Sequence, residues 1–236
     1  MSHRPSVCQT NRTSSGHLRC SFALNPSAIL PKGAIPDNNH QHQRCVTEGR
    51  LEPRAQVIIL NGIGSVGKSS TAKALQAITS KPFLHVAMDA FLDMLPEKML
   101  AHPDGLMFEA AQDGGKPIIA IRSGPILERA MRGMRHAVAT MAEQGNNLII
   151  DEVMIGAGAT QEYRALLRSF DFHLVGLFAP LDVLEARERA RGDREVGLAR
   201  WQYGRVHSDI AYDLEVDTTA AAPAECARLI RDAFGL

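Results

Sequence analysis

The sequence predicts an α/β fold in which a parallel sheet carries helices on both faces. From residue 56 onward, short apolar runs rich in β-branched residues alternate with longer stretches of helical periodicity. This alternation is typical of parallel strands joined by crossover helices. The chain has 236 residues, 45% of them hydrophobic, which is enough to bury a core of this kind.

Each strand of the predicted sheet is a short apolar run bounded by residues that favour turns or helix starts. The first run is followed by Asn61 and Gly62. The strands predicted in this way are Val57–Leu60, Phe83–Met88, Asn147–Ile150, His173–Ala179 and Leu214–Val216.

Segments with apolar residues on one face are predicted to be the connecting helices. They are Ser69–Ile78, Ala90–Leu100 with a kink at Pro96, Ile126–Glu143, Thr160–Ser169, Leu181–Ala190 and Pro223–Ala233. Between the second and third helices, Leu106–Ala111 and Pro117–Ile121 flank Asp113-Gly114-Gly115, a sequence typical of a β-hairpin turn.

Residues 53–236 are predicted to form one domain, and residues 1–52 a disordered N-terminal extension. The extension is rich in Ser, Asn, His, Arg and Pro and lacks a sustained apolar period. A transit peptide, or a start codon assigned too far upstream, would explain the same composition. Its histidines and cysteines are irregularly spaced, which argues against a zinc site.

Charge and composition disfavour several kinds of partner. The 26 basic side chains balance 26 acidic ones, so nothing in the total charge indicates a nucleic-acid or membrane partner. No apolar run is long enough to span a bilayer. The four cysteines form no C-x-x-C pair, and we expect a reducing, cytoplasmic location. The sequence is compatible with an oligomer and leaves the oligomeric state open.

A glycine-rich segment lies between the first predicted strand and the first helix. It satisfies the P-loop pattern G-x-x-x-x-G-K-[ST], whose glycines let backbone N–H groups turn toward phosphate oxygens. We expect Lys68 to span the β- and γ-phosphates of ATP and Ser69 to bind Mg²⁺. The alternative is a glycine-rich turn without a ligand. The residues expected to bind the nucleotide here are Gly62, Gly64, Ser65, Val66, Gly67, Lys68, Ser69 and Ser70.

Two carboxylates follow predicted strands at the edge where open α/β sheets keep their sites. Asp89 is a candidate general base for an incoming hydroxyl, and its alternative role is the N-cap of the next helix. Asp151 follows Leu148–Ile150 and has the position of a Walker B acid that orients Mg²⁺, the alternative being a capped turn. Its neighbour Glu152 can share or exchange that role.

Arginines gather near the C-terminal end of the predicted Leu181–Ala190 helix. Arg187 and Arg191 share a helix face, and Gly192–Asp193 is expected to end the helix and start a mobile loop. On such a lid, Arg191 and Arg194 are expected to neutralise charge during phosphoryl transfer. The alternative is a solvated helix in which Glu185 and Glu188 pair with the arginines.

Several segments together resemble the chloramphenicol phosphotransferase family of P-loop kinases, from about Val57 to Leu229. Besides Ile58-Ile-Leu-Asn-Gly and the P-loop, the resemblance lies in three groups of segments. They are His85-Val-Ala-Met-Asp89 with Leu148-Ile-Ile-Asp151-Glu152-Val, Arg187-Glu-Arg-Ala-Arg191-Gly-Asp-Arg194, and Val206-His207 with Tyr212-Asp-Leu-Glu-Val-Asp217-Thr218-Thr219.

The resemblance implies a P-loop kinase fold with a five-stranded parallel sheet and an arginine-rich lid. It implies an ATP-dependent O-phosphotransferase that acts on a hydroxyl of a small molecule, with a chloramphenicol-like antibiotic as the best single choice. By residue-for-residue match, Asp89 is then the general base and Arg187, Arg191 and Arg194 are the lid arginines. Asp217 and Thr218 would lie near the nucleotide base.

The chain departs from the family pattern near the acceptor. Ala90 and Glu152 stand where the antibiotic-modifying member has Ser and Asp, and Leu106–Ile121, which should border the acceptor pocket, is the least alike. The acceptor therefore stays open, and the alternatives are a kinase of another small metabolite or a P-loop ATPase that serves as a regulatory switch. The absence of N-K-x-D disfavours a GTPase, and a nearly neutral body disfavours a polynucleotide 5′-kinase.

Overall fold

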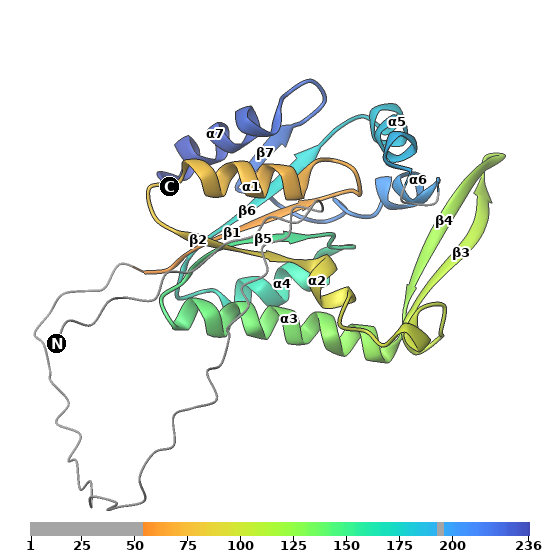
Figure 1. Cartoon of the computed structure of the whole chain (residues 1–236), viewed down its shortest axis with the longest axis horizontal. Helices are drawn as coiled ribbons and strands as arrows, with labels where there is room; N and C mark the ends of the chain where they lie inside the picture. The colour runs from red at the N-terminus through yellow and green to blue at the C-terminus, as the bar shows by residue number, and fades with distance from the viewer. Residues whose placement is uncertain (1–53, 193–195) are drawn as a thin grey trace, which may run out of the picture. The chain divides into compact units, whose positions relative to one another are not determined.

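Five strands form a parallel sheet in the order β2–β5–β1–β6–β7 (Figure 1). The computed structural model describes residues 54–192 and 196–236, so the predictions for residues 1–52 and for Arg194 lie outside the described residues. The predicted α/β class and five-stranded sheet are confirmed. The strands are β1 (Gln56–Gly62), β2 (Phe83–Ala87), β5 (Asn147–Glu152), β6 (Asp171–Phe178) and β7 (Leu214–Asp217).

Two pairs of helices cover the sheet, one pair on each face (Figure 1). Ile58 and Leu60 of β1 pack in a core with α1 and α7, whereas Val57 and Ile59 pack with α3 and α4. Because both faces of β1 are buried, its sequence is continuously apolar instead of alternating. The covering helices are α1 (Lys68–Ile78), α3 (Pro125–Glu143), α4 (Ala157–Leu166) and α7 (Pro223–Phe234).

The predicted hairpin is present and forms its own two-stranded antiparallel sheet. It consists of β3 (Leu106–Asp113) and β4 (Lys116–Ser123), and it projects from the end of the molecule where α3 begins (Figure 1). Gly114 and Gly115 make the two-residue turn with φ of 55° and 79°, a left-handed conformation that favours glycine. At the other end, the N–H of Gly124 donates to the carbonyl of Gly105 at 2.7 Å and closes the base.

The predicted Ala90–Leu100 helix is wrong in extent. The structure has a short α2 (Met88–Leu92), a turn, and a 3₁₀ helix η1 (Glu97–Met99) with Pro96 as its N-cap. Proline disfavours helical geometry in the residue before it and lacks an N–H, so Pro96 separates the two pieces instead of kinking one helix. Helix α5 (Leu181–Arg191) ends at Gly192, with φ of 66°, as the sequence predicts.

The sequence analysis missed a short helix, α6 (Leu198–Tyr203). This helix contacts the hairpin, α5 and the P-loop. Its N-cap, Gly197, has φ of 116°, and its carbonyl accepts a hydrogen bond from Ile119 of β4 at 3.2 Å. A Cβ atom at Gly197 would come within 2.7 Å of the Pro117 carbonyl oxygen, so only glycine allows α6 to start this close to the hairpin.

Glu188 of α5 holds the start of α6. Its carboxylate is buried and accepts hydrogen bonds from the N–H groups of Gly197 and Ala199 at 2.9 and 2.8 Å. These are N–H groups that a helix start leaves without intrahelical partners. The interpretation of Glu188 as a solvated partner of the arginines is therefore wrong. Glu185 does pair with one of the arginines, Arg200 of α6.

Across the described parts of the chain, the helices fall short of the length and apolarity that crossing a bilayer requires.

Candidate active site

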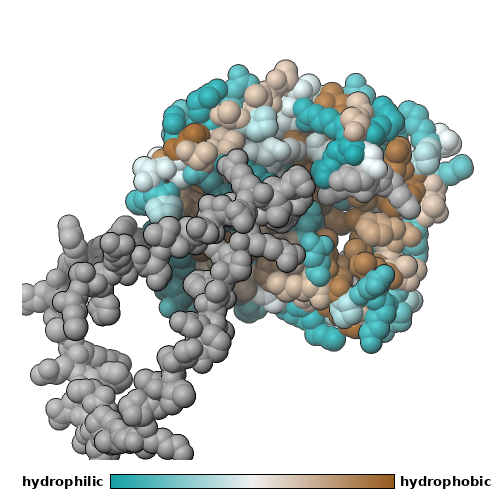
Figure 2. Space-filling view, viewed as in Figure 1, coloured by the Kyte–Doolittle hydropathy of each residue, from teal (hydrophilic) through white to brown (hydrophobic). Residues whose placement is uncertain are grey.

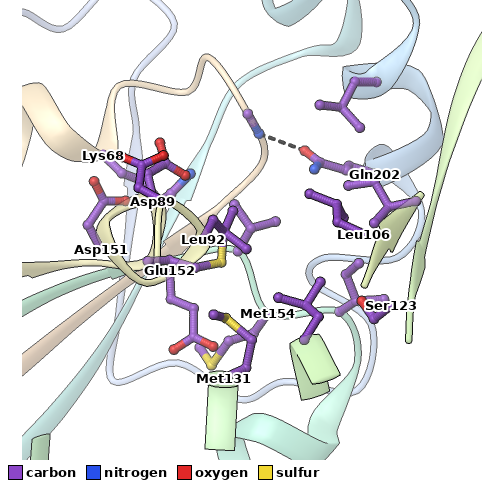
Figure 3. Close-up of a pocket in the computed structure, with 18 of the residues that line it drawn as sticks. Lys68, Asp89, Leu92, Leu106, Ser123, Met131, Asp151, Glu152, Met154 and Gln202 are labelled. Carbon is purple, nitrogen blue, oxygen red and sulfur yellow. Dashed lines mark hydrogen bonds between the residues drawn. The ribbon is translucent and has the colours of Figure 1, made fainter. Parts of the chain in front are cut away.

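A cavity of about 1040 Å³ lies at the edge of the sheet where the parallel strands end. The P-loop, α2 and the end of β5 form one side of it, and the β3–β4 hairpin, the start of α3 and α6 form the other. Figure 2 shows this opening with hydrophobic residues around it. In Figure 3, Lys68, Asp89 and Asp151 gather at one end, which we call the phosphate end. Leu106, Ser123, Met131 and Met154 lie at the other, the acceptor end.

Most of the predicted P-loop residues line the phosphate end. Gly62 and Val66 are buried beneath the loop, and Lys68 is 8% exposed. The Lys68 ammonium donates to the carbonyls of Gly62 and Ile63 at 2.8 and 3.2 Å, so it lies over the loop backbone and also lines the cavity. The P-loop residues on the cavity wall are Gly64, Ser65, Gly67, Lys68, Ser69 and Ser70.

The two residues predicted to hold Mg²⁺ are brought together from different elements. Ser69 Oγ of α1 donates to Asp151 Oδ2 of β5 at 2.5 Å. Burial opposes the charge on Asp151, but the His85 ring 3.7 Å away, the Lys68 ammonium and the Ser69 hydroxyl together lower the pKa of that carboxyl. An ionised carboxylate beside a hydroxyl suits a hard cation such as Mg²⁺, which also takes water and phosphate oxygens as ligands.

Asp89 lines the cavity near Lys68 but does not cap a helix. The N-cap of α2 is Ala87, and Asp89 is the second residue of the helix. The alternative interpretation of Asp89 as an N-cap is therefore wrong, because α2 begins earlier than the sequence suggested. Its carboxylate lies on the cavity wall with the P-loop residues. Its role as general base stays a prediction.

Glu152 points away from the predicted Mg²⁺ residues, toward the acceptor end (Figure 3). It is 3% exposed, and its Oε2 accepts a hydrogen bond from the hydroxyl of Tyr163 at 2.6 Å. Its Oε1 lies 3.6 Å from Nη1 of Arg135. Burial raises the pKa of Glu152, against the effects of Tyr163 and Arg135. The expectation that Glu152 shares the role of Asp151 is not supported by this geometry.

The predicted arginines have different surroundings. Arg191 lines the cavity. Arg187 instead donates to the hydroxyl and carbonyl of Thr218 at 3.2 and 2.6 Å, and to the carbonyl of Thr219 at 3.2 Å. Asp217 accepts from the N–H of Thr219 at 2.7 Å. The structure thus brings together Arg187, Asp217 and Thr218, three predicted nucleotide-binding residues, away from the cavity wall.

Two buried amides that the sequence analysis did not single out fix the P-loop. The Oε1 of Gln202 in α6 accepts the Gly64 N–H at 2.7 Å. Asn61, at the end of β1, accepts from the N–H of Met154 at 2.8 Å and donates to the carbonyl of Val206 at 3.1 Å. A polar residue that ends an apolar strand directly before a phosphate loop is a signal that could have found Asn61. Gln202 had no such signal.

His207 supports the same region from behind. Its ring stacks on Phe178 with centroids 4.0 Å apart, and its Nδ1 shares a hydrogen bond with the Tyr212 hydroxyl at 2.8 Å. Tyr212 is in turn hydrogen-bonded to Asn61 at 2.6 Å. Burial, together with the charge of Lys68, lowers the pKa of His207 to about 4, so the ring is neutral at neutral pH.

A five-stranded parallel sheet with a P-loop between β1 and α1 defines a P-loop kinase fold, and solved structures agree. The APS kinase of Mycobacterium tuberculosis, in complex with AMPPNP and APS, has a TM-score of 0.55 at 16% identity, over 78% of this chain and 99% of that one. The tunicamycin resistance protein of Deinococcus radiodurans has a TM-score of 0.55 at 18% identity, over 78% and 97%. A gluconokinase of Sinorhizobium meliloti has a TM-score of 0.53 at 14% identity, over 78% and 93%.

The sequence identifies the family within this class. Residues 55–235 match the family described as chloramphenicol phosphotransferase-like protein, and the chain belongs to that family of kinases. A Mycobacterium tuberculosis protein named "Putative O-phosphotransferase Rv2636" is 31% identical over 191 residues. This match covers 77% of the present chain and 83% of the mycobacterial one. The resemblance found from the sequence is confirmed.

Proposed function

We propose that this kinase transfers the γ-phosphoryl group of ATP to a hydroxyl group of a small molecule. The observation that carries the proposal is that one cavity joins the P-loop and Asp89 to an apolar end with room for an acceptor. Ligand pockets are typically apolar cavities with a few polar groups, and this one has that character. A nucleotide switch that only hydrolyses ATP has no need of the apolar end.

The phosphate end supplies the groups that phosphoryl transfer requires. The P-loop N–H groups and Lys68 bind the phosphates, and Ser69 and Asp151 would hold Mg²⁺. A bound Mg²⁺ would neutralise charge on the phosphate oxygens. Asp89 accepts the proton as the acceptor oxygen forms its bond to the γ-phosphorus. The bond from that phosphorus to the bridging oxygen breaks, and ADP leaves.

The remaining predicted residues have roles around the nucleotide. Arg191 lies on the cavity wall and, with Arg194, would neutralise charge that builds up on the transferred group. Arg187 shapes the loop of Asp217 and Thr218, and this loop would lie near the nucleotide base. We expect the reaction to take place in the reducing cytoplasm.

A chloramphenicol-like antibiotic is the best single choice of acceptor, and antibiotic resistance is then the biological role. Two comparisons support this choice: the name of the family, and the name of the structurally similar tunicamycin resistance protein. The apolar side chains at the acceptor end suit such a molecule. A kinase of another small metabolite stays the alternative, because the hairpin that borders the pocket is the part least like the family.

The test is a screen of hydroxyl acceptors, chloramphenicol included, with γ-labelled ATP and Mg²⁺. We expect label to reach at least one acceptor, and this transfer to be lost in Asp89→Asn. ATP hydrolysis that is equally fast with and without every acceptor would favour the regulatory ATPase. The same assay on residues 53–236 alone tests whether that segment is the whole catalytic domain, because full activity is then expected.

A further inference from the structure

Two buried charged side chains, Glu152 and Arg135, stand among apolar residues at the acceptor end of the cavity. Both line the cavity, and their side chains are 4% and 13% exposed. Glu97, another acidic residue on the wall, is exposed, and the buried Asp151 lies at the phosphate end. The lining around the pair is aliphatic or thioether, with Leu106, Ile119, Leu127, Met131 and Met154.

Glu152 and Arg135 each direct one polar atom toward the other. Glu152 uses Oε2 for the Tyr163 hydroxyl, and Arg135 uses Nε for Glu162 Oε2 at 2.6 Å. The two facing atoms, Glu152 Oε1 and Arg135 Nη1, form an ion pair at 3.6 Å, which is too far for a hydrogen bond. Within residues 54–192 and 196–236, neither of these two atoms makes a hydrogen bond.

The outer hydrogen bonds keep the pair apart. Tyr163 comes from α4 and is fully buried, so it fixes the Glu152 carboxylate from behind. Glu162, also on α4, fixes the Arg135 guanidinium in the same way. Both residues line the cavity, so a polar group that enters it can hydrogen-bond to both atoms together, whereas an apolar group cannot. A pair fixed before the ligand arrives loses little entropy on binding.

We propose that Glu152 and Arg135 form a second polar subsite of the acceptor pocket, which binds an uncharged group able both to donate and to accept a hydrogen bond. A hydroxyl or an amide N–H donates to Glu152 Oε1, and its oxygen accepts from Arg135. This inference rests on the proposed kinase function and adds the acceptor class. The acceptor carries a second hydroxyl or amide besides the hydroxyl that is phosphorylated.

The same geometry disfavours other acceptors. A carboxylate or phosphate would bind Arg135 but meet the charge of Glu152 at close range. A purely apolar alcohol would bury the pair without hydrogen bonds. A site built to bond a polar group discriminates strongly against the analogue that lacks it. We expect the matched polar acceptor to bind about ten- to a hundredfold more tightly.

The experiment compares three probes that differ only at the second group. They are 3-phenylpropan-1-ol, 1-phenylpropane-1,3-diol and the ketone 3-hydroxy-1-phenylpropan-1-one, with further diols in which the hydroxyls are two or four carbons apart. Calorimetry on the full chain loaded with AMPPNP and Mg²⁺ measures binding without requiring transfer. For the wild type, we expect at least one diol to bind about tenfold or more tightly than the alkanol and the ketone.

Glu152→Gln tests the direction of the hydrogen bond. If the Gln oxygen keeps the bond from Tyr163, the subsite presents only donors, and the preference for the diol over the ketone should disappear. AMPPNP affinity and melting temperature should stay within the range of the control Glu97→Gln, an exposed acid on the same cavity wall. A merely structural role for Glu152 would change stability and leave the probe preference intact.

Equal wild-type binding of the diols and the alkanol, or no binding of any diol, overturns the subsite. The kinase function survives that result if the acceptor screen shows label transfer. A screen without transfer to any hydroxyl overturns the kinase function, and the subsite with it. A preference for the diol over the ketone that persists in Glu152→Gln also counts against the subsite.

Discussion

At its phosphate end, the cavity is bounded by elements of the central sheet, whereas at its acceptor end it is bounded by a hairpin, a short helix and the start of α3. The P-loop joins β1, the middle strand, to α1, and Asp151 is part of β5, which pairs with β1. The two strands of the hairpin form a sheet of their own, separate from the central sheet. The groups that act on the phosphates thus come from the central sheet and the loop that follows its middle strand, whereas much of the apolar wall at the acceptor end comes from the hairpin and α6.

This contrast predicts that substitutions at the two ends have separable effects. The largest expected effect is at the phosphate end. Lys68→Ala should lower kcat about a thousandfold, since it removes a donor aimed at charge that develops on the phosphates. Acceptor binding should be unchanged. Lys73→Ala, an exposed lysine of the same helix, is the control. A variant that turns over like the wild type would show that the P-loop assignment is wrong.

Asp89→Asn tests the point where the two ends meet. General-base removal typically costs about 10²–10⁴ in rate, and we expect at least a hundredfold loss of kcat with AMPPNP binding retained. Because Ala87 and not Asp89 is the N-cap, the expected loss of stability is only about 0.3–1 kcal/mol, the effect of a charge in the first helical turn. Near-normal turnover on the true acceptor would reduce Asp89 to an orienting residue.

Glu188→Gln tests the support of the acceptor end. The change removes the charge from both bonds to the start of α6 and replaces one acceptor oxygen by an NH2 group that cannot accept, so we expect a loss of about 1–3 kcal/mol in the free energy of unfolding. Glu185→Gln lies on the same helix and breaks only the pair with Arg200, at a cost of less than about 1 kcal/mol. Denaturant titrations measure both. Equal losses would mean that the buried cap adds nothing.

The smallest expected effect is a pH dependence near the phosphate end. The pKa of His207 is about 4 in the folded chain and 6.5 without its surroundings. Between these values only the unfolded chain binds the proton. The stability that the neutral, buried ring contributes to the folded chain is therefore fully present above pH 6.5 and is lost as the pH falls toward 4. His207→Phe retains a ring against Phe178 and cannot titrate. Its stability should fall less than that of the wild type between pH 7.5 and 5, and an equal fall would contradict this account.

The same contrast explains what the sequence could predict. The P-loop, Asp89 and Asp151 lie within a few residues of strand ends, so a local pattern finds them. Gln202 contacts Gly64, which lies 138 positions away in the sequence. Glu188 contacts residues nine and eleven positions further along the chain. All three contacts depend on α6, whose six residues are too few to show a clear helical period in the sequence. The sequence left open whether Asp151 or Glu152 faces the metal, because neighbouring residues of a strand point to opposite faces and the sequence alone does not say which one does.

The hairpin has a consequence for how acceptor choice can change. Gly105 and Gly124 are hydrogen-bonded to each other, so residues 106–123 leave the body and return to it at one place. Such a segment can be exchanged as a unit, because changes in its length or residues do not shift the register of the central sheet. Exchanging it between relatives would replace one wall of the pocket and leave the P-loop, Asp89 and Asp151 in place, provided that the new segment keeps the hydrogen bond to Gly197 at the start of α6. By the same route, members of the family can come to accept different molecules through changes in this hairpin alone.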